Sequence, residues 1–167
     1  MIDLETHDTR PTARILSIGA VMFDPREAEL GDEFYAVLNF ESQEGRTVSQ
    51  ATLDWWDLEG TEAAKALTRQ PAEALQSALA KFRMWWDRCG AKYPWSHGAT
   101  FDIGMLDHAY GYKAPWKFWN VRDTRTMYWL ANTKPVRQAT HHDALEDAKA
   151  QALAVQRAWR LLKETQR

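Results

Sequence analysis

The alternation of apolar and polar positions separates a strand-rich first quarter of the chain from a helical remainder. Residues 1–5 form a short candidate strand, and residues 15–23 are a nearly continuous apolar run, which is typical of a buried strand. Asp24 and Pro25 end that run, and a third candidate strand follows at residues 33–39. The pattern therefore predicts an antiparallel meander of three strands before the first helix.

Helical periodicity dominates the rest of the chain. Helices are predicted over residues 52–58, 61–67, 71–90, 124–130 and 143–163, and from residue 102 onward. Two further strands, at residues 93–97 and 118–122, alternate with these helices. We expect a single α/β domain, residues 1–167, whose mixed sheet of about five strands (the meander, then two parallel strands) is flanked by helices.

Composition fits one compact domain. A chain of 167 residues with 45% hydrophobic content is long enough for one core. No stretch approaches the roughly twenty apolar residues of a membrane span. The amino terminus has an acid at its third residue instead of the basic and then apolar pattern of a signal peptide. The single cysteine, Cys89, excludes an internal disulfide and fits a reducing compartment. We expect a cytoplasmic protein, and the formal charge of −2 gives no global basic field.

Asp3 and Glu5 are the first candidates for chemistry. They lie two residues apart on a predicted strand, so both side chains leave the same face. Two carboxylates held together raise one another's pKa unless a positive charge lies between them, and a divalent cation supplies that charge. A solvated strand end is the alternative interpretation, so this pair needs partners elsewhere in the chain.

Three later residues are candidate partners. Asp102 begins a helix directly after a predicted strand, where α/β sheets place ligands, although a helix cap would look the same. Asp147 lies in the first turns of the last helix, five positions after His142. Five helical residues would turn the two side chains about 140° apart, so His142 must stand on the loop before the helix to reach the same site. Its ordinary pKa near neutrality suits a general base.

These residues resemble the DEDDh exonucleases of the ribonuclease H-like fold, which are named for four acids and a histidine. The matching motifs are Asp3-Leu-Glu5-Thr6, Phe101-Asp102 and His142-Asp-Ala-Leu-Glu-Asp147-Ala, in the family's order. Further segments are similar to the subgroup that contains ribonuclease AS and the nuclease module of exodeoxyribonuclease VIII, among small phage and bacterial proteins. They are Thr52-Leu-Asp-Trp-Trp56, Trp95-Ser-His-Gly-Ala-Thr-Phe-Asp102 and Arg122-Asp-Thr-Arg-Thr126.

The resemblance implies a metal-dependent exonuclease that removes mononucleotides from the 3′ ends of single-stranded RNA or DNA, in a bacterial or phage-infected cell. It implies two Mg²⁺ or Mn²⁺ ions about 3.5–4 Å apart. Their ligands would be Asp3, Glu5, Asp102 and Asp147, and Glu5 would also position the attacking water beside His142. His141 competes for the base role on composition alone, but the motif spacing favours His142. A homodimer is the expected assembly.

Substrate contacts are also implied. The resemblance points to Thr6 and Phe101 around the terminal nucleotide, and His97 stands where the resembling proteins have asparagine. Trp55 and Trp56 cannot both face the core from one helix turn, so one is a candidate stacking platform for a base. Packing of both between helices is the alternative.

Lys134 and Arg137 precede the candidate base on the same loop. They are candidate phosphate contacts, and two solvated loop charges are the alternative.

Several functions remain open. RNA is favoured over DNA by the ribonuclease AS-like motifs, although nothing in the sequence senses a 2′-hydroxyl. A binding module with a structural metal site would not need the histidine, and a ribonuclease H-like endonuclease would lack the spacing from His142 to Asp147. The products separate these alternatives: mononucleotides from an exonuclease, oligomers from an endonuclease and none from a binding module.

Overall fold

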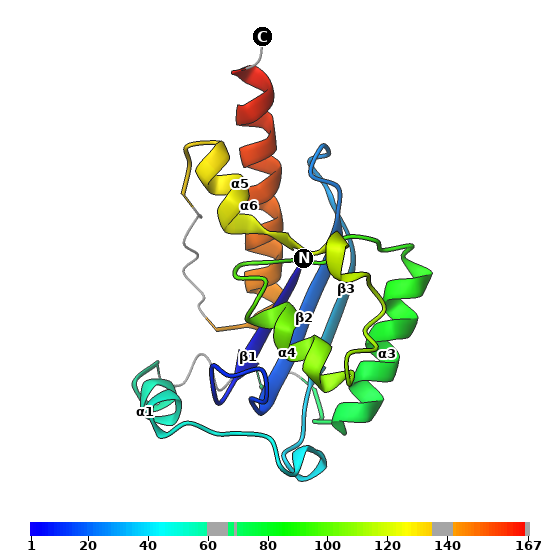
Figure 1. Ribbon diagram of the computed structural model, residues 1–167, viewed down its shortest axis with the longest axis vertical. Coiled ribbons are helices and arrows are strands. Elements are labelled where there is room, and N and C mark those ends of the chain that lie inside the picture. Colours follow the sequence, from blue (N-terminus) through cyan, green and yellow to red (C-terminus); the bar gives the residue numbers. More distant parts are fainter. Residues whose placement is uncertain (60–66, 69, 135–141, 166–167) are drawn as a thin grey trace.

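A computed structural model describes residues 1–59, 67–68, 70–134 and 142–165 (Figure 1). The strands are β1 (Ile2–Thr6), β2 (Ile15–Phe23), β3 (Leu30–Val37), β4 (Trp95–Ser96) and β5 (Arg122–Asp123). The helices are α1 (Gln50–Glu59), α3 (Leu75–Arg88), α4 (Asp102–Ala109), α5 (Thr124–Leu130) and α6 (Ala144–Glu164), with short 3-10 turns η1 (Glu41–Gln43) and η2 (Phe118–Asn120). The predicted helix at 61–67 lies almost entirely outside the described residues.

The predicted meander is confirmed. β1 pairs antiparallel with β2, and β2 pairs antiparallel with β3, so β2 is the central strand and β1 is an edge strand of this sheet. In the register of the first pair, Asp3 lies opposite Gly19 and Leu4 opposite Ile18. Because side chains alternate along a strand, Asp3 and Glu5 share one face of β1 while Ile2 and Leu4 share the other.

The sheet is covered on both faces (Figure 1). Ile2, Leu4 and Ile18 pack into the larger core with residues of α3 and α4. On the other face, Val21 packs with the apolar side of α6 in a second core. Burial on both faces explains why β2 reads as a continuous apolar run instead of an alternating one. Asp3 and Glu5 therefore lie on the face that α6 covers.

Gly19 sets how closely α6 approaches the sheet. A Cβ atom at this position would lie 2.1 Å from the backbone carbonyl carbon of Ala144 and 2.2 Å from the backbone nitrogen of Leu145. The first turn of α6 thus rests directly on the backbone of β2, and only glycine leaves room for it. This contact brings the start of α6 over the strand that pairs with the acidic positions of β1.

The predicted sheet of about five strands is not found in the described part of the chain. β4 and β5 are two residues long and pair with each other in parallel, apart from the meander. The reason lies at the β1 edge, where the backbone N–H of Leu4 donates to the Asp102 carboxylate at 3.1 Å instead of to a strand carbonyl. Gly98, with φ of 111°, turns the chain away just after β4.

Other boundaries also differ from the prediction. Residues 118–120 form the turn η2, so the predicted strand at 118–122 shrinks to β5. The predicted helix from residue 71 begins at Leu75, because the backbone of Glu73 bridges to the strand end at Val37 and Asn39. Asp143 caps α6 as predicted, accepting hydrogen bonds from the N–H groups of Leu145 and Glu146.

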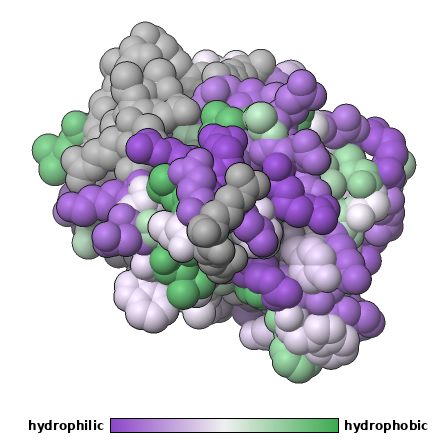
Figure 2. Space-filling view, turned by 90° about the horizontal axis from the view of Figure 1, so that it is seen from above, coloured by the Kyte–Doolittle hydropathy of each residue, from purple (hydrophilic) through white to green (hydrophobic). Residues whose placement is uncertain are grey.

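Hydrophilic side chains cover most of the face seen in Figure 2, and the hydrophobic ones form small separate groups. Among the described residues, no helix combines the length and the apolar character that a membrane crossing requires.

Candidate active site

The five residues predicted to carry the chemistry meet in one place. Asp3, Glu5, Asp102, His142 and Asp147 all line a cavity of about 490 Å³ at the edge of β1. One carboxylate oxygen each from Asp3, Glu5 and Asp147 lies within 4.8 Å of the other two. β1 supplies the first two acids on one face, and the approach of α6 over Gly19 supplies the third. This spacing suits oxygen ligands around a small hard cation.

Asp102 stands beside this group of three carboxylates rather than within it. It begins α4 and is almost fully buried. Its Oδ1 atom accepts the hydrogen bond from the backbone N–H of Leu4, which fixes it between Asp3 and Glu5 along the strand. Asp102 thus joins the end of β4, the start of α4 and the edge of β1 at one point.

Burial and mutual repulsion make these acids hard to ionise without a cation. Burial, followed by repulsion from Asp102, Glu5 and Asp147, raises the pKa of Asp3 well above its ordinary value. Burial and the charges of Asp147 and Asp102 do the same to the pKa of Glu5. Burial raises the pKa of Asp102 to about 7, although the Leu4 N–H favours its charged form. A bound divalent cation would relieve this repulsion.

His142 stands on the loop before α6, as its distance from Asp147 requires. Its backbone has φ of 72°, a left-handed conformation that few side chains adopt, and its N–H donates to Asp147 Oδ2 at 3.1 Å. The two residues are therefore held together through the backbone of one and the carboxylate of the other. Backbone conformations of such high free energy cluster at functional sites in proteins.

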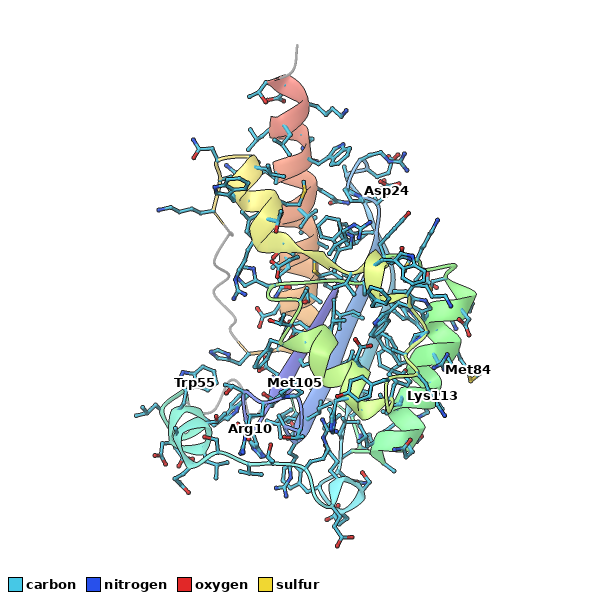
Figure 3. All side chains as sticks on the ribbon, viewed as in Figure 1. Arg10, Asp24, Trp55, Met84, Met105 and Lys113 are labelled. Carbon is cyan, nitrogen blue, oxygen red and sulfur yellow. The ribbon has the colours of Figure 1, made fainter. Side chains whose placement is uncertain are left out.

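Two neighbouring tryptophans of α1 contact the His142 ring. Trp55 lies edge-on to it with ring centroids 4.5 Å apart, and Trp56 lies at 5.7 Å. Trp55 projects from α1 toward the start of α6 (Figure 3). The indole N–H of Trp56 donates to the Thr6 carbonyl at 2.9 Å, which ties α1 to the end of β1. Both tryptophans therefore contact the predicted base.

A second cavity of about 390 Å³ adjoins the first. Thr6, Phe101, Trp55 and Trp56 line it, and Glu5 and Phe101 line both cavities. The structure thus brings four predicted substrate contacts together on the Glu5 side of the acids. The Thr6 hydroxyl donates to the Asp8 carbonyl at 2.8 Å, so its backbone faces Trp56 while its side chain stays within the loop.

The remaining predicted contacts are divided. His97 lines the first cavity. Lys134 is exposed after α5 and lines neither cavity. Arg137 and the competing base His141 lie outside the described residues.

Two polar residues of the first cavity were not predicted. Gln151 donates from Nε2 to Asp3 Oδ1 at 2.7 Å. It follows Asp147 by four positions, so one face of α6 presents both, and this spacing was readable from the sequence. Arg125 lines the same cavity from the first turn of α5. It lies within the segment Arg122-Asp-Thr-Arg-Thr126, where an exposed arginine gives no distinct signal.

Comparisons with known proteins agree with this geometry. The model of the 3′-5′ exoribonuclease Rv2179c-like domain matches residues 1–159. An exodeoxyribonuclease of Enterobacteria phage T4 is 26% identical over 159 residues, in an alignment that covers 75% of this chain and 68% of the phage protein. Because the family model spans nearly the whole chain and includes every acid of the cavity, this protein belongs to the Rv2179c-like family of 3′-5′ exoribonuclease domains.

Proposed function

We propose that this protein is a DEDDh exonuclease of the ribonuclease H-like fold, which removes single nucleotides from the 3′ end of single-stranded RNA. The convergence of four carboxylates and one histidine on a single cavity carries the proposal. A binding module would not need a histidine held beside the acids by a strained backbone and two aromatic rings.

The residues present fit two Mg²⁺ or Mn²⁺ ions. The donors are all carboxylate oxygens, three of them within 4.8 Å of one another, and repulsion already raises the pKa of the acids. Asp3, Glu5, Asp102 and Asp147 would hold the ions. When bound, the ions supply positive charge at the scissile phosphate and lower the pKa of the attacking water.

The chain's own residues would orient and deprotonate the water. Glu5 faces both cavities, so its carboxylate can align a water between the terminal nucleotide and the acids. His142 then accepts the proton of that water, and its ring is positioned by its contacts with the Trp55 and Trp56 rings.

The cavity beside Thr6 and Phe101 would receive the terminal nucleoside. Its aromatic walls, Phe101, Trp55 and Trp56, suit a flat base of any identity. RNA is the proposed substrate because the family is one of exoribonuclease domains. DNA is the second candidate, and the phage exodeoxyribonuclease supports it.

The test uses single-stranded RNA and DNA of one sequence, labelled at the 5′ end, with Mn²⁺, Mg²⁺ or EDTA. We expect a ladder that shortens from the 3′ end and nucleoside monophosphate products, with RNA cleaved faster. EDTA, Asp147→Asn and His142→Ala should each reduce kcat by at least about a hundredfold.

Matched controls separate chemistry from folding. His108→Ala removes a histidine of α4 outside both cavities, and Asp54→Asn removes an exposed acid of α1. Both should retain wild-type rates. Internal cleavage products would favour an endonuclease, and tight binding without products would replace the proposal with a binding module.

A further inference from the structure

Arg125 places a positive charge on the wall of the acidic cavity. It is exposed, it lines the cavity beside Asp102, and its charge favours the ionised form of that acid. No ion pair of Arg125 is found among the residues that the structure describes. A guanidinium without a carboxylate partner inside a nuclease site has donors available for a phosphate.

The surrounding backbone holds Arg125 in place. A Cβ on Gly98 would lie 2.5 Å from Arg125 Nη1, so the guanidinium packs on the bare backbone of this glycine. Asp123 joins the two segments, because its carboxylate accepts hydrogen bonds from the N–H groups of Ala99 and Arg125, both at 2.8 Å. His97 adds a third link through Nδ1 to the Thr124 hydroxyl, also at 2.8 Å.

His97 contributes polarity rather than charge. Burial and the neighbouring Arg125 lower the pKa of its imidazole, which favours the neutral form of the ring. One ring nitrogen is engaged with Thr124. The net charge of this wall therefore comes from Arg125, and His97 can add a hydrogen bond to the same ligand.

The order of the side chains along the two cavities indicates in which direction a bound nucleic-acid strand would run. Trp55, Trp56 and Thr6 line only the second cavity, Glu5 and Phe101 line both, and Arg125 and His97 line only the first. If the terminal nucleoside occupies the second cavity and the acids face the scissile phosphate, the next group of the strand to meet the protein is the preceding phosphate. That phosphate would lie on the wall formed by Arg125 and His97.

We propose that Arg125, assisted by His97, binds the phosphate one nucleotide upstream of the scissile phosphate. This inference rests on the proposed exonuclease function and adds a subsite to it. It makes Arg125 a substrate-binding residue that selects for a strand continuing on the 5′ side, and it sets the shortest substrate that is cleaved well.

The test compares two dinucleotides that differ only in this phosphate. The substrate pNpN carries a 5′ phosphate at the upstream position, and NpN carries a hydroxyl there. For the wild type in Mn²⁺, we expect kcat/KM to be at least about tenfold higher for pNpN, because hydrogen bonds to charged groups contribute at this level. Arg125→Ala should remove that preference by raising KM for pNpN while leaving NpN nearly unchanged.

Two further variants sharpen the comparison. Arg125→Lys should recover part of the preference, since lysine keeps the charge but not the planar pair of donors. Arg157→Ala removes an exposed arginine of α6 that lines neither cavity, and it should keep the full preference. Wild-type melting temperature in both alanine variants would confirm that the fold is intact.

Each outcome either supports the subsite or overturns it. Loss of the preference in Arg125→Ala, with Arg157→Ala unchanged, supports the upstream subsite. An equal fall on both dinucleotides would place Arg125 at the scissile phosphate or in the fold, and an unchanged preference would remove it from binding. Either result overturns the subsite. If the wild type cleaves neither the dinucleotides nor a longer strand, the exonuclease proposal itself fails.

Discussion

Replacing Gly19 with alanine should separate α6 from the sheet. The new Cβ would lie 2.1 Å from the Ala144 backbone, whereas ordinary contacts begin near 3.4 Å, so α6 must move by roughly the difference, 1.3 Å. Neither neighbour can rotate away, because both are backbone atoms. Overpacking of this kind costs typically 1–3 kcal/mol, and we expect about 3 kcal/mol here.

The displacement should affect catalysis more than folding. Asp147 lies in the first turn of α6, so it would move away from the oxygens of Asp3 and Glu5 that now lie within 4.8 Å. A misplacement of about 1 Å at a reacting centre can cost about a hundredfold in rate. We therefore expect kcat to fall by about that factor, and the divalent ion to raise the melting temperature less than in the wild type.

The assay is thermal unfolding with and without Mn²⁺, followed by RNA shortening. A loss of about 3 kcal/mol should lower the melting temperature by about 6–12 °C for a domain of this size. Gly104→Ala is the control. Gly104 lies within α4 with nothing within 4 Å of the added Cβ, so alanine should stabilise the helix by about 1 kcal/mol. Gly19→Ala with wild-type melting and wild-type rate would refute the reasoning.

Three other outcomes follow from the site. In EDTA the free energy of unfolding should fall by on the order of 4 kcal/mol as the pH rises from 4 to 7. The folded state keeps the Asp102 proton up to a pKa of about 7, while the unfolded chain releases it near 3.8. A melting temperature that stays constant across this window would contradict the burial of that acid. Asp143→Ala should remove the cap of α6 and lower the free energy of unfolding by about 1 kcal/mol, yet Mn²⁺ should still stabilise this variant. Asp147→Asn should lose the stabilisation by Mn²⁺, and calorimetry with and without the ion checks both variants. Trp56→Phe should retain a ring beside His142 and lower kcat less than Trp56→Ala, and equal kcat values would remove Trp56 from positioning the base.

The sequence identifies the acids because their signals are local. Asp3 and Glu5 share a face through the two-residue period of a strand, and the five-residue step from His142 to Asp147 is a motif by itself. The meander is predicted for the same reason, since long strands carry a periodic signal. Strands of two residues carry none, so β4 and β5 are misjudged in length and in their place relative to the meander.

Contacts between distant segments are not readable in this way. The bond from Leu4 to Asp102 joins residues 98 positions apart, and it decides the edge of the sheet. The contact of Trp55 with His142 depends on where the loop before α6 lies, so the sequence leaves stacking on a base and packing as equal alternatives. Arg125 gains meaning only through the packing on Gly98.

The engagement of Leu4 by Asp102 also bears on solubility. β1 is an edge strand, and an edge with a free N–H group can pair with the same strand of another molecule. The Asp102 carboxylate accepts a hydrogen bond from that donor, so the side chain that we propose as a metal ligand also keeps the β1 edge from pairing. Asp102→Ala would leave this buried donor unpaired, which costs about 1–3 kcal/mol and favours local opening of the β1 edge, so self-association would rise with protein concentration. Asp102→Asn keeps an acceptor for the Leu4 N–H, and it should remain monodisperse under conditions in which the alanine variant aggregates.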